Sequence, residues 1–102
     1  MNETQTILLS EAHVTTATPR RYLGQLCKHF QHKLPVSLSE YHGRIEFPTG
    51  ACELGAATDF TLTLQVRAPD EQALGRLEDV VARHLKRFAF REEIDIQWTR
   101  AA

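Results

Sequence analysis

The sequence predicts an α+β fold, a two-layer sandwich in which two helices cover one face of a mostly antiparallel sheet. Apolar residues alternate with polar ones in six segments, and a helical apolar repeat marks two others. These segments follow one another in the order β-α-β-β-β-β-α-β, which is typical of this fold class. A length of 102 residues fits a single domain over 1–102, with an ordered core at about 7–99.

The first strand and the first helix are expected near the N-terminus. A period of two over residues 8–15 indicates a strand. Thr18 followed by Pro19 favours a helix start, because the threonine oxygen accepts an early amide bond and proline is tolerated at the first helical position. The helix is expected to run from Pro19 to about Lys33, since Pro35 stops it.

Four short antiparallel strands, a second helix and a last strand are expected next. The helix opens at Pro69 and has an apolar repeat that ends at Phe88. Alternation of Ile94, Ile96 and Trp98 predicts the last strand. The apolar positions of the four middle strands are Val36 and Leu38, then Ile45 and Phe47, then Cys52, Leu54 and Ala56, then Phe60, Leu62, Leu64 and Val66.

Each predicted strand has only one apolar side, so both helices are expected on the same face of the sheet. The other face is then polar. Its predicted members are Glu11, His13, Glu46, Glu53, Thr61, Thr63 and Gln65.

Composition and charge exclude several classes of protein. A chain with 42% hydrophobic and 25% charged residues is typical of globular proteins. A net charge of −1 lacks the basic footprint of a nucleic-acid binder, and no stretch of eighteen apolar residues indicates a membrane helix. The N-terminal segment has no signal-peptide pattern, which favours a cytoplasmic protein. Cys27 and Cys52 show no CxxC spacing, so buried free thiols are expected.

The stretch "LCKHFQHKLPV" carries most of the functional signal. Helical spacing places basic residues together on the side opposite the apolar stripe. This basic face predicts binding of an anionic small molecule or an acidic protein partner. The alternative is a solvated face whose cations complement the negative end of the helix. The candidate binding residues are Arg21, Lys28, His29, His32 and Lys33.

A second interpretation is a small metal-binding or thiol-dependent enzyme. Its ligands would be Cys27, His29 and His32, joined by His42 and Cys52 through the fold. A regular helix turns Cys27 away from His29, and two histidines fall short of the three or four ligands that zinc needs. No nucleophile motif or phosphate loop is present. We therefore favour a non-enzymatic module without a cofactor.

Other polar residues are interpreted as structural. His84 borders the apolar stripe of the second helix and is expected to be half-buried and hydrogen-bonded. Asp79 and Arg83, four residues apart, predict a surface ion pair. The charges of "RFAFREE" are expected to be solvated, namely Arg87, Arg91, Glu92 and Glu93.

Three stretches together carry a family resemblance: "TPRRYLGQLCKHFQHKLPV", "GRIEFPTGACEL" and "LEDVVARHLKRFAFREEIDIQWTR". From about Ala12 to Arg100 the chain resembles the bacterial domain-of-unknown-function family 2218. The resemblance implies a two-layer domain of TATA-binding-protein-like topology. It also implies an association with iron metabolism, because members occur alone or beside siderophore-interacting, flavin-dependent ferric reductases. Such a flavoprotein is therefore the expected partner, while the resemblance identifies no catalytic residue.

Overall fold

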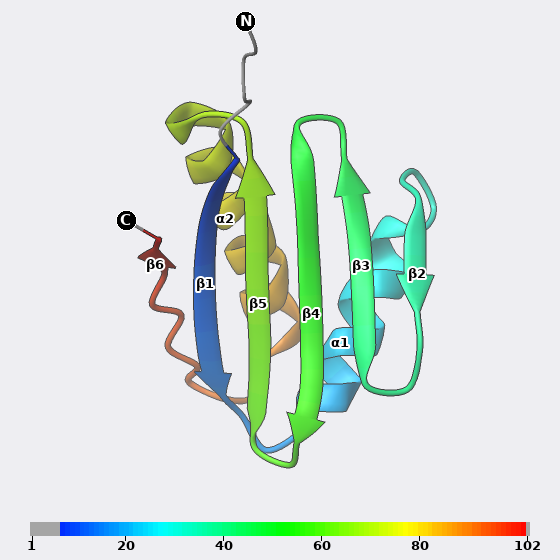
Figure 1. Cartoon of the computed structure of the whole chain (residues 1–102). Helices are drawn as coiled ribbons and strands as arrows, with labels where there is room; N and C mark the ends of the chain where they lie inside the picture. The colour runs from blue at the N-terminus through cyan, green and yellow to red at the C-terminus, as the bar shows by residue number, and fades with distance from the viewer. Residues whose placement is uncertain (1–6, 102) are drawn as a thin grey trace, which may run out of the picture.

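The computed structural model describes residues 7–101. All its strands belong to one sheet with the order β2-β3-β4-β5-β1-β6, and every neighbouring pair is antiparallel (Figure 1). The predicted α+β sandwich is therefore confirmed. Its elements are β1 (Leu8–Thr15), α1 (Pro19–Phe30), β2 (Val36–Leu38), β3 (His42–Phe47), β4 (Gly50–Thr58), β5 (Thr61–Ala68), α2 (Glu71–Phe88) and β6 (Thr99–Arg100).

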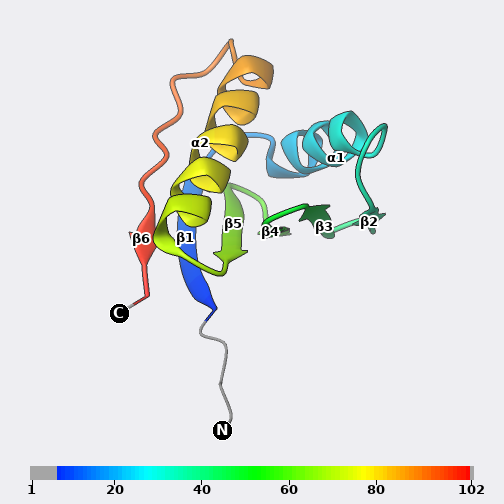
Figure 2. The ribbon, with the colours of Figure 1, turned by 90° about the horizontal axis from the view of Figure 1, so that it is seen from above.

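Both helices cover the same face of the sheet, as predicted (Figure 2). Helix α1 packs mainly on β3 and β4, and helix α2 packs mainly on β5 and β1. The helices also contact each other, so a seam runs between them above the sheet. Residues from both helices line the same surface along this seam.

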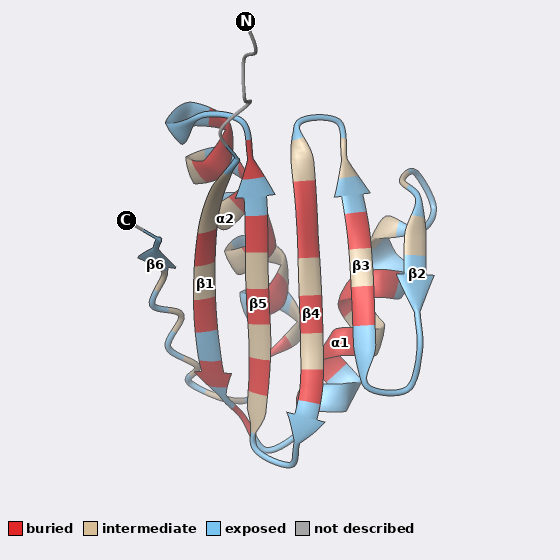
Figure 3. Ribbon diagram, viewed as in Figure 1, coloured by how far each residue is buried: buried red, intermediate tan, exposed pale blue. Residues whose placement is uncertain are grey.

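The alternation along the strands separates the core from the open face (Figure 3). Leu64 lies opposite Ala12 on one side and Leu54 on the other, and all three are buried beneath the helices. The intervening positions point away from the helices, because successive side chains of a strand alternate between faces. The seven polar residues predicted for the open face occupy these intervening positions.

The helices bury the stripes that their spacing predicts, but their ends differ from expectation. Helix α1 ends at Phe30, and the chain then turns, with the Leu34 N–H donating to the Phe30 carbonyl at 2.9 Å. The Thr18 side chain makes no capping bond. In α2, Asp70 caps the first turn by accepting from the Ala73 N–H at 2.8 Å. Neither helix in residues 7–101 is long and apolar enough to cross a membrane.

Two strand predictions are wrong. Ile94, Ile96 and Trp98 are partly buried against the core but form no ladder, and only Thr99–Arg100 pairs with β1. Their alternation therefore reflects packing of one side of an extended segment. Phe60 was predicted to face the core, yet it is 65% exposed. The pairing of Thr58 with Thr61 leaves Phe60 in the hairpin turn, where the pleat is interrupted.

Candidate functional site

A cleft lies where the C-terminal end of α1, the following turn, helix α2 and the end of β3 come together. Its volume is about 520 Å³, within the range of small-molecule sites. The lining combines apolar rings with basic side chains. We call it the histidine cleft, and its residues are His29, Phe30, His32, Lys33, Leu34, Phe47 and His84.

The floor of the histidine cleft is aromatic. Phe30 and Phe47 meet edge to face with ring centroids 5.2 Å apart, and both pack against the hydrophobic core. Phe30 also contacts the His84 ring at 4.9 Å. Such edge-to-face and tilted arrangements are the favourable ones for aromatic rings. The floor is thus a fixed surface supported by the core.

Two histidines from different helices face each other at the rim. The ring centroids of His29 and His84 are 4.9 Å apart. The Nδ1 atom of His84 lies 2.7 Å from the Val80 carbonyl oxygen. A carbonyl only accepts hydrogen bonds, so Nδ1 carries the proton and Nε2 remains available to a ligand. The half-buried, hydrogen-bonded state predicted for His84 is confirmed.

The histidine cleft carries positive charge without a matching acid. No carboxylate lines it, and no ion pair among residues 7–101 involves Lys33 or any of its three histidines. His29 is exposed, but partial desolvation by its neighbours lowers its pKa below its usual value. Neighbouring basic groups lower that pKa further, and these are His84, Arg87, His32 and Lys33. An anion entering the cleft would relieve this repulsion.

The structure brings together only part of the predicted basic face. His29, His32 and Lys33 line the histidine cleft. Arg21 lies near the other end of α1 and lines a separate hollow of about 480 Å³ beside Phe60. Lys28 is exposed on the helix surface and lines neither space. The five candidates therefore do not converge on one ligand.

The two thiols belong to the core. Cys27 and Cys52 are unpaired and fully buried, as predicted. Burial raises the pKa of Cys27 to about 11, and burial also raises the pKa of Cys52. The Cys27 Sγ fills the space that a Cβ at Gly43 would need. A reactive cysteine needs exposure and a lowered pKa, and neither thiol has them.

The ligand set of the metal hypothesis is divided among three places. Cys27 and Cys52 are in the core, His29 and His32 line the cleft, and His42 pairs with Glu53 on the open face. Within residues 7–101, no three histidine, cysteine or acidic side chains are grouped so that they could hold a metal ion.

Glu92 was expected to be solvated, and the structure corrects this. It accepts hydrogen bonds from the Tyr22 hydroxyl at 2.7 Å and the Thr16 hydroxyl at 2.8 Å, and a longer one from the Ala17 N–H. The bond from Tyr22, followed by that from Thr16, holds the pKa of Glu92 below its usual range despite burial. Glu92 thereby fastens the segment after α2 to the start of α1.

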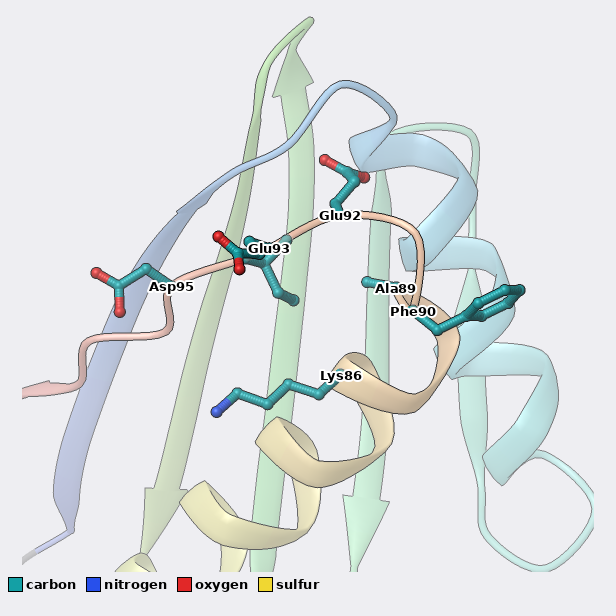
Figure 4. A pocket seen from close by; sticks show the side chains of 7 residues that line it. Lys86, Ala89, Phe90, Glu92, Glu93 and Asp95 are labelled. Carbon is teal, nitrogen blue, oxygen red and sulfur yellow. The ribbon is translucent and has the colours of Figure 1, made fainter.

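A second hollow, of about 510 Å³, lies between that segment and α2 (Figure 4). Lys86, Glu93 and Asp95 extend on one side of it, while Phe90 points away from Lys86. Its charges are of both signs, and the oxygens of Glu92 are already bonded to Thr16 and Tyr22. With three acidic residues and one lysine, this hollow has an excess of negative charge, opposite in sign to that of the histidine cleft.

Sequence reasoning missed four lining residues of the cleft, namely Phe30, Leu34, Phe47 and His84, and the nearby cation Arg87. The basic stretch "RHLKR" in α2 was a signal for His84 and Arg87. Neither helix alone reveals which of its faces meets the other helix, because their relative rotation depends on long-range packing.

Comparison with known proteins places this architecture in a family. The family model described as "Uncharacterized protein conserved in bacteria (DUF2218)" matches residues 11–99. The chain belongs to this family. A solved structure, the NMR structure of PA4090 from Pseudomonas aeruginosa, is similar, with a TM-score of 0.77 and 38% sequence identity over 90% of this chain and 95% of that one. No curated protein matches the chain.

Proposed function

We propose that this domain is a non-enzymatic binding module that holds an anionic small molecule in the histidine cleft. One observation carries the proposal: the basic side chains of the cleft have no acidic partner and stand above an aromatic floor. Lys33 supplies a permanent charge, and the histidines supply donors. An anion with an apolar body matches both parts of this lining.

A thiol-dependent enzyme is a weaker interpretation. Both cysteines are buried, and the pKa of Cys27 is raised by its burial to about 11, so the thiolate that would attack a substrate is disfavoured at neutral pH. The cleft itself contains no serine, cysteine or carboxylate. Binding without a covalent step therefore accounts best for its composition.

The proposal extends to iron metabolism. The anion would be a ligand of the iron–siderophore system, and the partner would be a siderophore-interacting flavoprotein in the cytoplasm. Support for this extension comes from the family resemblance, in which related domains occur beside such reductases. A reducing cytoplasm would also keep both thiols unpaired. Calorimetric titration of the domain with a purified flavoprotein of this class tests the partner, and absence of binding would exclude it.

Charge reversal at two lysines tests the cleft. Lys33→Glu changes a lining residue, whereas Lys28→Glu makes the same change on the exposed surface of α1 outside the cleft. Citrate, its ferric complex and benzoate serve as probes in calorimetric titrations. We expect Lys33→Glu to weaken binding about tenfold or more and Lys28→Glu to leave it nearly unchanged. Both variants should melt within a few degrees of the wild type.

Salt provides an independent check of the same proposal. Binding should weaken between about 0.1 M and about 1 M salt, because the screening length falls from about 10 Å to about 3 Å. Equal losses in the two lysine variants would identify the solvated face of α1 as the site. Failure of all three probes to bind the wild type would overturn the proposal.

A further inference from the structure

The histidine cleft is part of a larger group of packed rings. His29 contacts Phe30 with ring centroids 5.0 Å apart and Phe88 at 5.7 Å, both edge to face. Phe30 in turn contacts Phe47 and His84. Rings from two helices and a strand therefore form one continuous aromatic frame. A flat ring that enters the cleft would extend this frame with the same edge and face contacts.

The basic residues at the rim of the histidine cleft favour a ligand with a negative charge. Among the lining residues, Lys33 is the one whose positive charge is permanent near neutral pH. A carboxylate between Lys33 and the histidine pair would gain a second charged donor only if one imidazole is protonated. His84 already uses its Nδ1 hydrogen to bond Val80, so its Nε2 is the position where it would accept that proton.

We propose that the histidine cleft selects a flat aromatic monocarboxylate and takes up one proton, on the His29–His84 pair, when it binds. This inference rests on the proposed function and adds the chemical class of the ligand. The ring would lie against the Phe30 and Phe47 frame. The carboxylate would face Lys33 and the protonated histidine.

Proton uptake follows from the groups that surround His29. From α2 these are His84 and Arg87, and from α1 and its turn they are His32 and Lys33, all basic. In the empty cleft they disfavour a charge on His29, and partial desolvation lowers its pKa as well. A bound carboxylate reverses the balance and raises the pKa of His29. Affinity must then increase as pH falls, by up to about tenfold per pH unit for one proton.

A metal ion is the competing occupant of a two-histidine rim. The bond from His84 Nδ1 to a backbone carbonyl resembles the support that metal-bound histidines receive. However, Lys33 lines the cleft, Arg87 lies close enough to lower the pKa of His29, and no carboxylate is present. These charges repel a cation and attract an anion, so we favour the carboxylate.

Calorimetry with three monocarboxylates tests the ligand class. Benzoate, cyclohexanecarboxylate and acetate carry the same charge but differ in ring character and size. We expect benzoate to bind at least about tenfold more tightly than acetate and several-fold more tightly than cyclohexanecarboxylate, because only benzoate adds aromatic contacts. Benzoate binding no tighter than acetate would overturn the ligand class. Citrate binding weakened by Lys33→Glu but not by Lys28→Glu would in that case still support the proposed function.

A separate experiment measures how many protons the domain takes up when the ligand binds. Benzoate is titrated into the wild type in two buffers of different ionisation enthalpy, at about pH 8 and about pH 6. We expect uptake of up to one proton and tighter binding at the lower pH. The double variant His29→Gln/His84→Gln should lose the pH dependence, and His13→Gln, exposed on the open face, should retain it.

The wild-type measurement does not depend on how the double variant folds. Benzoate affinity independent of pH, with no proton uptake in either buffer, would overturn the coupling. Zn²⁺ binding tighter than benzoate binding, and lost in the double variant while His13→Gln retains it, would overturn the inference in favour of a metal site.

Discussion

The open face of the sheet and the histidine cleft both carry charged side chains, but they arrange them differently. On the open face, Glu53 accepts hydrogen bonds from His42 and Arg44, and Arg44 also pairs with Glu46. In the histidine cleft, Lys33 and its neighbouring histidines make no ion pair within residues 7–101. One region satisfies its charges internally, and the other leaves them for a ligand.

The pKa values of one residue from each region illustrate this difference. Glu53 shows the paired case: burial by itself raises its pKa, but hydrogen bonds from His42 and Arg44 outweigh burial and lower it. His29, which is exposed, shows the unpaired case, since partial desolvation and neighbouring charges both lower its pKa. Paired charges stabilise the fold, whereas unpaired like charges disfavour each other until an anion arrives. Removing charges in each region therefore has different consequences for stability.

The largest loss of stability is expected when Glu92 is replaced, because this carboxylate accepts several hydrogen bonds. Glu92→Ala removes the acceptor for the Tyr22 hydroxyl, the Thr16 hydroxyl and the Ala17 N–H. We expect a loss of about 2 kcal/mol in the free energy of unfolding, measured by urea denaturation. Glu93→Ala, the exposed neighbour, is the control and should change it by less than about 0.5 kcal/mol. Equal effects would mean that the Glu92 bonds contribute nothing.

The open face should show an intermediate effect. Glu53→Ala leaves Arg44 and His42 without their shared acceptor, and we expect a loss of about 1 kcal/mol, because the group is only partly exposed. Glu46→Ala removes a more exposed partner of Arg44 and should cost less. Urea denaturation of both variants measures the difference. A larger loss for Glu46→Ala would reverse the assigned order.

The cleft should show almost no loss. Lys33→Ala removes a cation that has no acidic partner, so the free energy of unfolding should stay within about 0.5 kcal/mol of the wild type, or rise slightly. Thermal melting of the ligand-free protein measures this. A loss above about 1 kcal/mol would reveal a stabilising partner for Lys33 and weaken the contrast with the open face.

The smallest expected effect is a pH dependence. The folded protein lowers the pKa of His29 below its unfolded value, so the unfolded chain binds more protons. Stability should therefore decrease as pH falls through about 6.5, and it should be regained as pH rises. In His29→Gln this part of the dependence should disappear. Urea denaturation between about pH 7.5 and about pH 5.5 compares the two proteins, and parallel curves would contradict the lowered pKa.

The fold was largely predictable, because the sequence patterns that indicate its helices and strands are local. Alternation in the strands and the apolar stripe of α1 each record which side of an element is buried. The segment holding Ile94 and Ile96 misled this reasoning, since alternation reports burial and not pairing. It is held instead near Glu92 and by the Arg100 guanidinium, which donates to Glu78 at 2.9 Å and 3.1 Å. Neither contact has a local sequence signature.

The candidate site was only partly predictable for the same reason. His29, His32 and Lys33 are close in sequence, so helical spacing brings them together. His84 and Phe47 reach the same cleft from a second helix and a strand, through packing between segments that are far apart in the sequence. Helical spacing also grouped Arg21 with the cleft residues, although they lie at opposite ends of α1. Spacing predicts which side of a helix a residue lies on, but it does not predict which other elements pack beside that side.

The most direct test of the unpaired-charge account is amide NMR of the ¹⁵N-labelled wild type titrated with benzoate. If the histidine cleft is the anion site, the largest shift changes will fall on residues 29–34 and around Phe47 and His84, while Glu53 and the hollow near Arg21 stay unchanged. Shift changes concentrated on the open face or beside Arg21 would contradict the account. So would an unchanged spectrum at saturating concentrations of the anion.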